Sequence, residues 1–289
     1  MTFKIITDST ADLSKEFIEA NNITVLGMTI TVGEAVYQTI GDQAITNDTL
    51  LSEMNKGQKA TTSQINSGQF QEAFQSLITD DSELVYLGFS SGLSGTLQSA
   101  IIARDMILEE NANAKIYLVD TLAAASGEGL LVEEAVKYSQ SGKSAKETTE
   151  YIETLSKKLN SLFMVDDLNH LAKGGRIPKA VAVVGTMANI KPLMDVDTEG
   201  KLRSNAKVRG SKKALKALMD RTLEERDSNY SRIILSYSGS DQTVNEVKKE
   251  LLDKESNLDI SIRPLSPTIV SHTGSGTFAI FSIAKGNRK

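Results

Sequence analysis

Hydrophobic and polar positions in the first 160 residues alternate between short β-rich runs and longer runs with helical spacing. The short apolar runs, bounded by polar turns, predict strands at Phe3–Thr7, Ile23–Val32, Leu84–Phe89 and Lys115–Val119. Apolar residues at intervals of three and four predict helices at 12–20, 48–54, 70–77, Leu97–Asn111, Gly129–Tyr138 and Ser144–Leu159. Because strands and helices alternate, this part should form a mainly parallel sheet with helices on both faces.

Capping residues indicate where several of these helices begin. Asp12 is placed to cap the first helix, and Thr46 or Asp48 the second. Ser144 and Glu147 have the spacing of a capping box. The polar stretch from Lys59 to Asn66 is expected to be a turn that leads into the helix at 70–77.

The pattern changes near Ser161, where strands and helices no longer alternate one for one. The expected strands are Leu162–Val165, Lys191–Asp195, Lys201–Val208, Ile233–Tyr237 and Thr277–Ala284. The expected helices are Asp166–Ala172, Lys179–Met187, Ser211–Glu225 and Thr243–Lys254. The strands on either side of the turn 197–200 look like a hairpin, which favours an α+β unit. We therefore predict an α/β protein with two domains, an N-terminal α/β domain at residues 1–160 and a C-terminal α+β domain at 161–289.

Composition excludes several classes of function. Hydrophobic residues make up 40% of the 289 residues and charged residues 24%, as in soluble globular proteins. The absence of cysteine excludes disulfides, thiolate metal sites and a cysteine nucleophile, and only two histidines are present. With a net charge of −5, no tryptophan, no signal-peptide pattern and no long apolar run, we expect a cytoplasmic protein that binds neither nucleic acid nor membrane.

Charge is unevenly distributed along the chain. Between Lys173 and Arg232 there are 14 Lys and Arg residues against 7 Asp and Glu, a local balance of +7. Such segregation is usually a solvated face, but it also suits docking of an acidic or phosphate-bearing partner.

Three turns rich in hydroxyls and small residues are candidates for chemistry: Thr61–Gln64, Ser90–Thr96 and Ser271–Gly276. Hydroxyls and glycines are also what ordinary tight turns and helix caps use. The second turn is the most informative, because it follows a buried strand and precedes a long helix. Ligands bind at the carboxyl ends of parallel strands, and a helix N-terminus favours an anion such as a carboxylate or phosphate. The turn lacks the lysine of a nucleotide P-loop and the glycine spacing of a dinucleotide site.

A serine hydrolase is the alternative interpretation. The segment 92–96 resembles a nucleophile elbow, with Ser94 as nucleophile, although it ends in Thr96 instead of glycine. His272 lies downstream, where a hydrolase would have its base, but no acidic partner for it is evident. His170 lies in a polar helical segment and is expected to be exposed or simply packed.

Several motifs in order resemble the DegV family, the fatty-acid-binding proteins of bacteria. These motifs, which span nearly the whole chain, are ITDSTADLS, TTSQ, SSGLSGT, VDDLNHLAKGGRI, VGTMANIKPLM and a late histidine followed by glycine-rich sequence. Ile65 stands where the family often has proline, and the turn around His272 is a variant of the usual one. Neither departure removes a hydroxyl or the histidine.

The resemblance implies a two-domain α/β protein that encloses one long-chain fatty acid, such as palmitate or oleate, between its domains. Proteins similar to this are carriers without a cofactor, not enzymes, and serve as the lipid-carrying subunit of fatty acid kinase in phospholipid metabolism. A separate ATP-binding kinase subunit converts the carried carboxylate to an acyl phosphate.

The resemblance also assigns candidate residues. The carboxylate contacts fall on Thr62, Ser94 and His272, with Ser91 and Gly95 in the same turn as Ser94. Arg176 is the candidate for docking the kinase subunit. Arg203, Lys207 and Arg209 are further candidates for the same basic surface.

Overall fold

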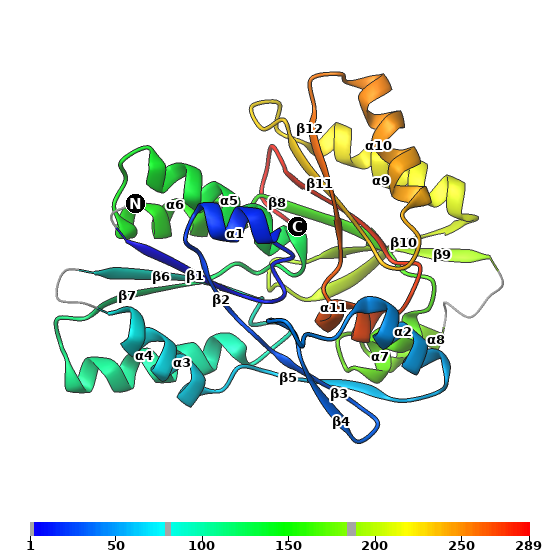
Figure 1. Ribbon diagram of the computed structural model, residues 1–289. Helices are drawn as coiled ribbons and strands as arrows, with labels where there is room; N and C mark the ends of the chain where they lie inside the picture. The colour runs from blue at the N-terminus through cyan, green and yellow to red at the C-terminus, as the bar shows by residue number, and fades with distance from the viewer. Residues whose placement is uncertain (1–2, 79–81, 184–188) are drawn as a thin grey trace.

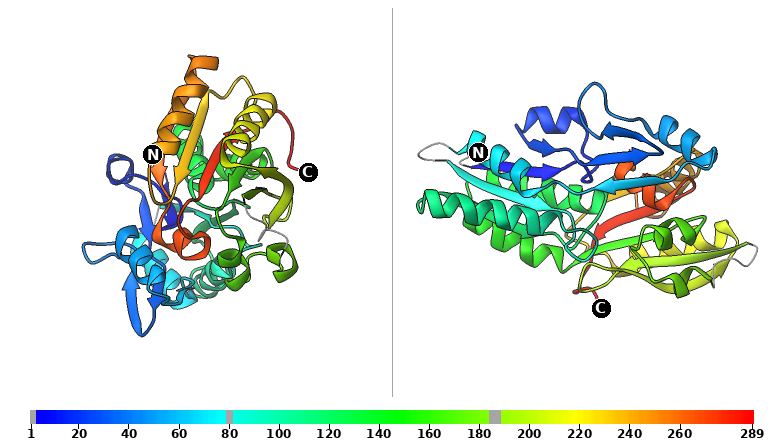
Figure 2. Two further views of the ribbon diagram at one scale, coloured as in Figure 1. Left: turned by 90° about the vertical axis from the view of Figure 1, so that its right-hand side faces the viewer. Right: turned by 90° about the horizontal axis from the view of Figure 1, so that it is seen from below.

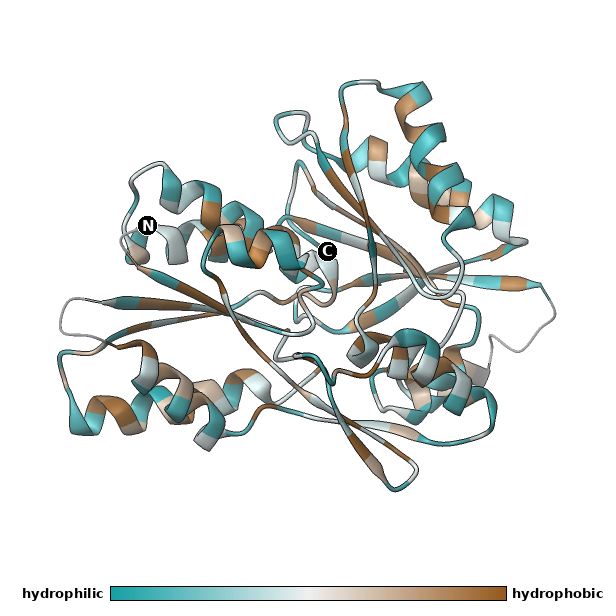
Figure 3. Ribbon diagram, viewed as in Figure 1, coloured by the Kyte–Doolittle hydropathy of each residue, from teal (hydrophilic) through white to brown (hydrophobic). Residues whose placement is uncertain are grey.

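The computed structural model describes residues 3–78, 82–183 and 189–289. Its strands form a four-stranded, a three-stranded and a six-stranded sheet among these residues (Figure 1). Hydrophobic residues concentrate in the strands of the two larger sheets, and hydrophilic residues follow the outer sides of the helices (Figure 3). No helix within these ranges has both the length and the apolar character needed to cross a membrane.

The four-stranded sheet is parallel throughout, with the order β2-β1-β6-β7. Its strands are β1 (Lys4–Asp8), β2 (Thr24–Leu26), β6 (Glu83–Gly88) and β7 (Lys115–Asp120). Helices α3 (Ser67–Leu77) and α4 (Thr96–Glu110) cover one face, and α5 (Ser126–Gln140) and α6 (Ala145–Ser156) cover the other (Figure 1). Successive residues of β1 accordingly pack on opposite sides, Ile6 toward α3 and α4 and Ile5 toward α5 and α6. The predicted parallel sheet with helices on both faces is confirmed.

The six-stranded sheet has the order β10-β9-β8-β13-β11-β12. Its strands are β8 (Leu159–Met164), β9 (Ile190–Val196), β10 (Leu202–Arg209), β11 (Arg232–Tyr237), β12 (Asp259–Pro264) and β13 (Phe278–Ile283). All neighbours are antiparallel except β11 and β12. Helices α9 (Ser211–Glu225) and α10 (Gln242–Lys254) cover its outer face (Figure 2). The mixed sheet confirms the α+β character predicted for the C-terminal part, including the β9–β10 hairpin.

The small antiparallel sheet has the order β4-β3-β5 and consists of β3 (Thr29–Val32), β4 (Ala35–Gln38) and β5 (Ala60–Ser63). The short helices α2 (Asn47–Asn55), α7 (Leu168–Lys173), α8 (Lys179–Val183) and α11 (Pro267–Thr273) gather beside it (Figure 1). Segments from both ends of the chain therefore meet here. The last residues of the predicted helix Lys179–Met187, and part of the VGTMANIKPLM motif, lie outside the described residues.

Several sequence predictions were wrong in their local detail. The single strand expected at Ile23–Val32 is divided between β2 and β3, which belong to different sheets. The turn expected at Lys59–Asn66 contains strand β5, because β-branched threonine fits an extended strand despite its polarity. The turn expected at Ser271–Gly276 begins inside α11, since its first three residues are the last turn of that helix.

Two helix boundaries also differ from expectation. Helix α1 (Lys15–Ala20) is capped by Ser14 and not by Asp12. Asp12 instead has a positive φ of 50°, and its carboxylate accepts hydrogen bonds from Ser126 and from the backbone N–H of Ser266. Helix α6 begins at the predicted capping box but ends at Ser156, so that Leu159 is free to begin β8.

Two carboxyl groups are completely buried beneath the carboxyl end of β1. Glu128 accepts hydrogen bonds from the hydroxyls of Thr7 and Thr10, both at 2.9 Å. Asp8 also contacts the Thr10 hydroxyl and accepts a bond from the Tyr86 hydroxyl at 3.1 Å. A hydroxyl donates only one proton, so the Thr10 hydroxyl can serve both carboxyls only if one of them is protonated. Burial raises the pKa of both Asp8 and Glu128, in agreement with a shared proton.

We expect the free energy of unfolding to fall less steeply with rising pH in Glu128→Gln than in the wild type. Because the folded pKa of Glu128 is raised above its ordinary value, the folded protein keeps a proton that the unfolded chain releases. The wild type should therefore lose up to about 1.4 kcal/mol of unfolding free energy per pH unit for each such proton as pH rises above about 4.5. Urea denaturation at a series of pH values measures this slope. An unchanged slope in Glu128→Gln would mean that Glu128 ionises in the folded protein as readily as in water.

Candidate functional site

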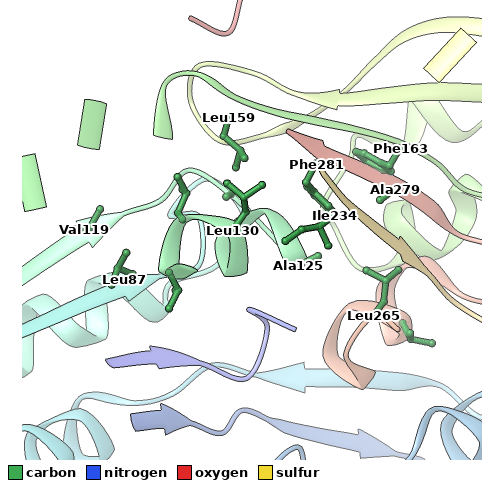
Figure 4. Packing of buried hydrophobic residues seen from close by; sticks show 14 of the residues in the cluster. Leu87, Val119, Ala125, Leu130, Leu159, Phe163, Ile234, Leu265, Ala279 and Phe281 are labelled. Atoms are coloured by element: carbon green, nitrogen blue, oxygen red, sulfur yellow. The ribbon is translucent and has the colours of Figure 1, made fainter. Parts of the chain in front are cut away.

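An apolar cavity lies between the inner face of the six-stranded sheet, helix α11 and the turn that joins β6 to α4. The empty space between its walls is about 790 Å³ when the open solvent at its mouth is counted with it. The apolar wall includes Phe89, Leu93, Phe163, Leu265, Ile269 and Phe281. These residues come from both sides of residue 160, and Figure 4 shows Phe163, Ala279 and Phe281 on neighbouring strands with Leu265 close to α11. The cavity therefore lies between the two parts of the chain, as a ligand between the domains would require.

One part of the cavity wall is polar, and its residues come from two of the three predicted turns. Thr62 on β5 and His272 on α11 both line the cavity, and the Thr62 Oγ1 atom lies 2.9 Å from His272 Nε2. They are brought together because α11 packs against β5. Burial, assisted by the positive charge of Arg176, lowers the pKa of His272 to about 4. The imidazole is therefore neutral at pH 7, with one N–H donor and one acceptor nitrogen.

The remaining predicted turn adds Ser94 to the same cavity. Ser94 Oγ accepts a hydrogen bond from the backbone N–H of Thr96 at 3.2 Å and lies 2.9 Å from the Thr96 hydroxyl. The side chain thus stands at the first turn of α4, where the helix dipole favours a negative charge. All three predicted turns therefore contribute a residue to one site.

Gly95 and Ser91 do not belong to the cavity lining. A side chain at Gly95 would collide with Gln64, so glycine here lets the segment after β5 pack closely on the start of α4. Gln64 completes this contact by donating from Nε2 to Ser99 Oγ at 3.1 Å. Ser91 is exposed, and its backbone N–H donates to Asp120 at 3.2 Å.

Arg176 is half-buried and lines the cavity beside this polar group. Its Nε donates to the Leu93 carbonyl at 3.3 Å and its Nη1 to the Gly174 carbonyl at 2.5 Å. No carboxylate among the described residues pairs with it, and burial lowers its pKa. Arg176 therefore connects the glycine turn after α7 to the turn that carries Ser94. Its place in the cavity wall was not predicted from the sequence.

The other basic candidates lie on the edge strand β10. Arg203 forms a bidentate ion pair with Asp195, with distances of 2.9 and 3.0 Å. Although burial opposes it, hydrogen bonds from Arg203 and Asn205 hold the pKa of Asp195 below its usual range. Lys207 and Arg209 are exposed. Of these three basic side chains, only Arg203 is held by an internal carboxylate.

Three further residues near the site were not predicted from the sequence. Gly174 lies so close to His272 that a side chain there would meet the imidazole Nδ1 atom. Ser161 on β8 and Thr268 on α11 both line the cavity. No sequence signal distinguishes these two from ordinary buried hydroxyls, because their position depends on how a strand and a helix face each other.

The geometry does not form a nucleophilic serine site. Ser94 Oγ is hydrogen-bonded to Thr96, while His272 Nε2 contacts Thr62. In the part of the chain that the structure describes, no carboxylate is hydrogen-bonded to His272. The same part contains no group of His, Asp and Glu side chains arranged to hold a metal ion.

Comparison with known proteins agrees with this description. The family model for the uncharacterised DegV family proteins matches residues 2–285. A DegV domain-containing protein of Lactococcus lactis is 61% identical over the full length of both chains, and one of Streptococcus pyogenes serotype M1 is 43% identical, again over the full length of both.

Solved structures show the same fold. The structure reporting fatty acid binding by a DegV family protein of Thermus thermophilus has a TM-score of 0.87 and 28% identity, and the match covers 98% of this chain and 100% of that one. DegV of Bacillus subtilis, a fatty acid binding protein, has a TM-score of 0.84 and 25% identity, with 99% and 100% covered. The sequence motifs, the two-part fold and these similarities agree throughout, and the chain belongs to the DegV family.

Proposed function

We propose that this protein binds one long-chain fatty acid, such as palmitate or oleate, in the cavity between its two parts. The observation that carries the proposal is a largely apolar cavity with Thr62, Ser94 and His272 on one part of its wall. The fatty acid binding reported for the Thermus thermophilus and Bacillus subtilis relatives supports the same ligand class.

The apolar wall would provide most of the affinity. Burying about 15 methylenes at about 0.8 kcal/mol each corresponds to a transfer free energy on the order of 12 kcal/mol. Loss of translational freedom and ordering of the chain reduce this value. Enough remains for tight binding without a salt bridge to the carboxylate, so the polar residues can serve to orient the head group.

We further propose that the protein is a carrier, not an enzyme by itself. The bound carboxylate would be presented to a separate ATP-binding kinase subunit. One carboxylate oxygen would attack the γ-phosphorus of ATP held by that subunit, the bond from the γ-phosphorus to the bridging oxygen would break, and ADP would leave. Thr62, Ser94 and the neutral His272 could hold the carboxylate without an ion pair, while the guanidinium of Arg176 in the same wall donates to the carbonyls of Leu93 and Gly174.

The carrier interpretation is favoured over a hydrolase by a specific contact. Since His272 Nε2 lies against Thr62, it is not positioned to take a proton from Ser94. Accordingly, a fluorophosphonate that labels activated serines should leave Ser94 unmodified.

The first test of the proposal is the ligand itself. Organic extraction of the purified protein followed by mass spectrometry should release close to one fatty acid per chain. After removal of this lipid, calorimetry should show uptake of added palmitate or oleate with one-to-one stoichiometry. Protein that is repeatedly recovered without lipid and that also fails to take up either acid would contradict the proposal.

The second test concerns the head group. We expect Ser94→Ala and Thr62→Val each to weaken fatty acid binding about tenfold or more, because a hydrogen bond to a charged group contributes roughly 1.5–3 kcal/mol. The double variant should lose less than the sum of the two effects, since both hydroxyls serve one carboxylate. Ser91→Ala is the matched control, because it removes an exposed hydroxyl of the same turn that does not line the cavity. Wild-type affinity and full phosphorylation in both site variants would rule out this position for the carboxylate.

The third test concerns the kinase subunit. We expect Arg176→Ala to raise the KM of the kinase for the loaded carrier several-fold, while fatty acid affinity changes much less, because the guanidinium donates to the Leu93 and Gly174 carbonyls. The effect should shrink as salt rises, since charge attraction between the proteins is screened. Arg209→Ala tests separately whether an exposed cation outside the cavity contributes to docking of the kinase. An equal loss of loading and of kinase turnover in Arg176→Ala would assign the residue to the cavity alone.

A further inference from the structure

The two hydroxyls that would hold the carboxylate belong to different parts of the fold. Thr62 lies on β5 in the small antiparallel sheet, whereas Ser94 lies in the turn that leads from the parallel sheet into α4. For one carboxylate to accept from both, each hydroxyl oxygen must lie within about 2.5–3.0 Å of it. The spacing of the two hydroxyls therefore depends on how these two parts of the fold contact each other.

Gln64 provides a hydrogen bond between the two parts. It directly follows β5 and is the second residue after Thr62. Its Nε2 donates at 3.1 Å to the Oγ atom of Ser99, which lies in the first turn of α4 and is only 6% exposed. In the described parts of the chain, no other hydrogen bond joins residues 60–66 to residues 90–99.

The amide of Gln64 also lies against Gly95, the residue after Ser94. A Cβ atom at position 95 would lie 3.3 and 3.4 Å from Cδ and Nε2 of Gln64, and closer still to its Oε1. Gly95 has a φ of −78°, which any residue adopts, so its backbone conformation does not require glycine. Its lack of a side chain instead leaves the space that the Gln64 amide occupies.

Apolar packing holds the same two segments together without fixing their exact position. Ile65 is 1% exposed and belongs to one hydrophobic cluster with Leu93 and Leu97. Such contacts have no preferred direction, whereas a hydrogen bond requires a defined distance and angle. Without Gln64, packing of Ile65 should therefore preserve the fold, while the two segments can shift slightly against each other.

We propose that Gln64 is a positioning residue that holds Thr62 and Ser94 at the spacing that one carboxylate requires. Neither Gln64 nor its partner Ser99 lines the cavity, so Gln64 acts through the two hydroxyls and not by contact with the ligand. This inference rests on the proposed fatty acid binding and adds a residue that determines affinity for the head group.

The experiment compares palmitate with hexadecanol, which has the same number of carbons but no carboxylate. Calorimetry on the delipidated protein should show palmitate binding about three- to tenfold weaker in Gln64→Ala and in Ser99→Ala, since a misplaced donor loses part of a bond to a charged group. Hexadecanol affinity should change less than about twofold, because the bonds of a neutral hydroxyl contribute less. Gln98→Ala is the matched control, because it removes an exposed glutamine of α4 that does not line the cavity.

Paired substitutions test whether the contact works as a unit. Gly95→Ala should weaken palmitate binding in the wild type, because its methyl group displaces the Gln64 amide. The same substitution should have little further effect in Gln64→Ala, where the space is empty. Gln64→Ala should likewise add little to Thr62→Val, because a single remaining hydroxyl has no spacing to preserve.

The outcomes separate this inference from the proposed function. Unchanged palmitate affinity in Gln64→Ala and Ser99→Ala would overturn the inference. Equal weakening of palmitate and hexadecanol, or full additivity of Gln64→Ala with Thr62→Val, would assign Gln64 to the general shape of the cavity and would overturn it as well. Failure of the wild type to bind palmitate or any other fatty acid would instead overturn the proposed function.

Discussion

Helix α5 determines how the two large sheets come together, because nearly its entire surface must be buried. Twelve of its 15 residues are buried, and the apolar ones belong to a single hydrophobic cluster that also contains Phe163 and Phe281 of the six-stranded sheet (Figure 4). The helix also buries Glu133, which accepts two hydrogen bonds of 3.0 Å from Arg232 and a further contact from Arg263. Although burial opposes it, these two arginines hold the pKa of Glu133 below its usual range. Strands β11 and β12 are therefore tied to a helix that belongs to the N-terminal part of the chain.

The position of α5 has a direct consequence for the cavity. A side chain at Gly127 would collide with the ring of Phe281, so glycine here allows the sheet to approach the helix closely. Phe281 in turn forms part of the cavity wall. The cavity occupies the part of the same interface that α5 does not fill, where the sheet faces α11 and the β6–α4 turn. Core packing and the ligand cavity are thus two parts of one contact between the sheets.

The sequence predicted best the elements with strong local signals. Helix α9 begins and ends at the predicted residues Ser211 and Glu225, and α6 begins at its capping box. The missed elements are short or rich in residues that also favour turns. Helix α11 has only seven residues, three of them Thr or Ser, so its pattern resembles the turn expected there. Strand β5 was missed because Thr61, Thr62 and Ser63 lack the apolar alternation that usually identifies a strand.

Only the residues of the candidate site that belong to local sequence motifs were predicted. Thr62, Ser94 and His272 were identified by resemblance, and the structure adds the Thr62–His272 contact and the burial that keeps His272 neutral. The approach of Arg176 to this group depends on the tertiary fold, and so its effect on the pKa of His272 was not foreseeable. A carboxylate bound beside these residues would oppose the effect of Arg176 and raise the pKa of His272. Fatty acid binding would then be accompanied by proton uptake at pH values near the pKa of His272. Under the proposed function, the same arrangement would hold the head group without neutralising it.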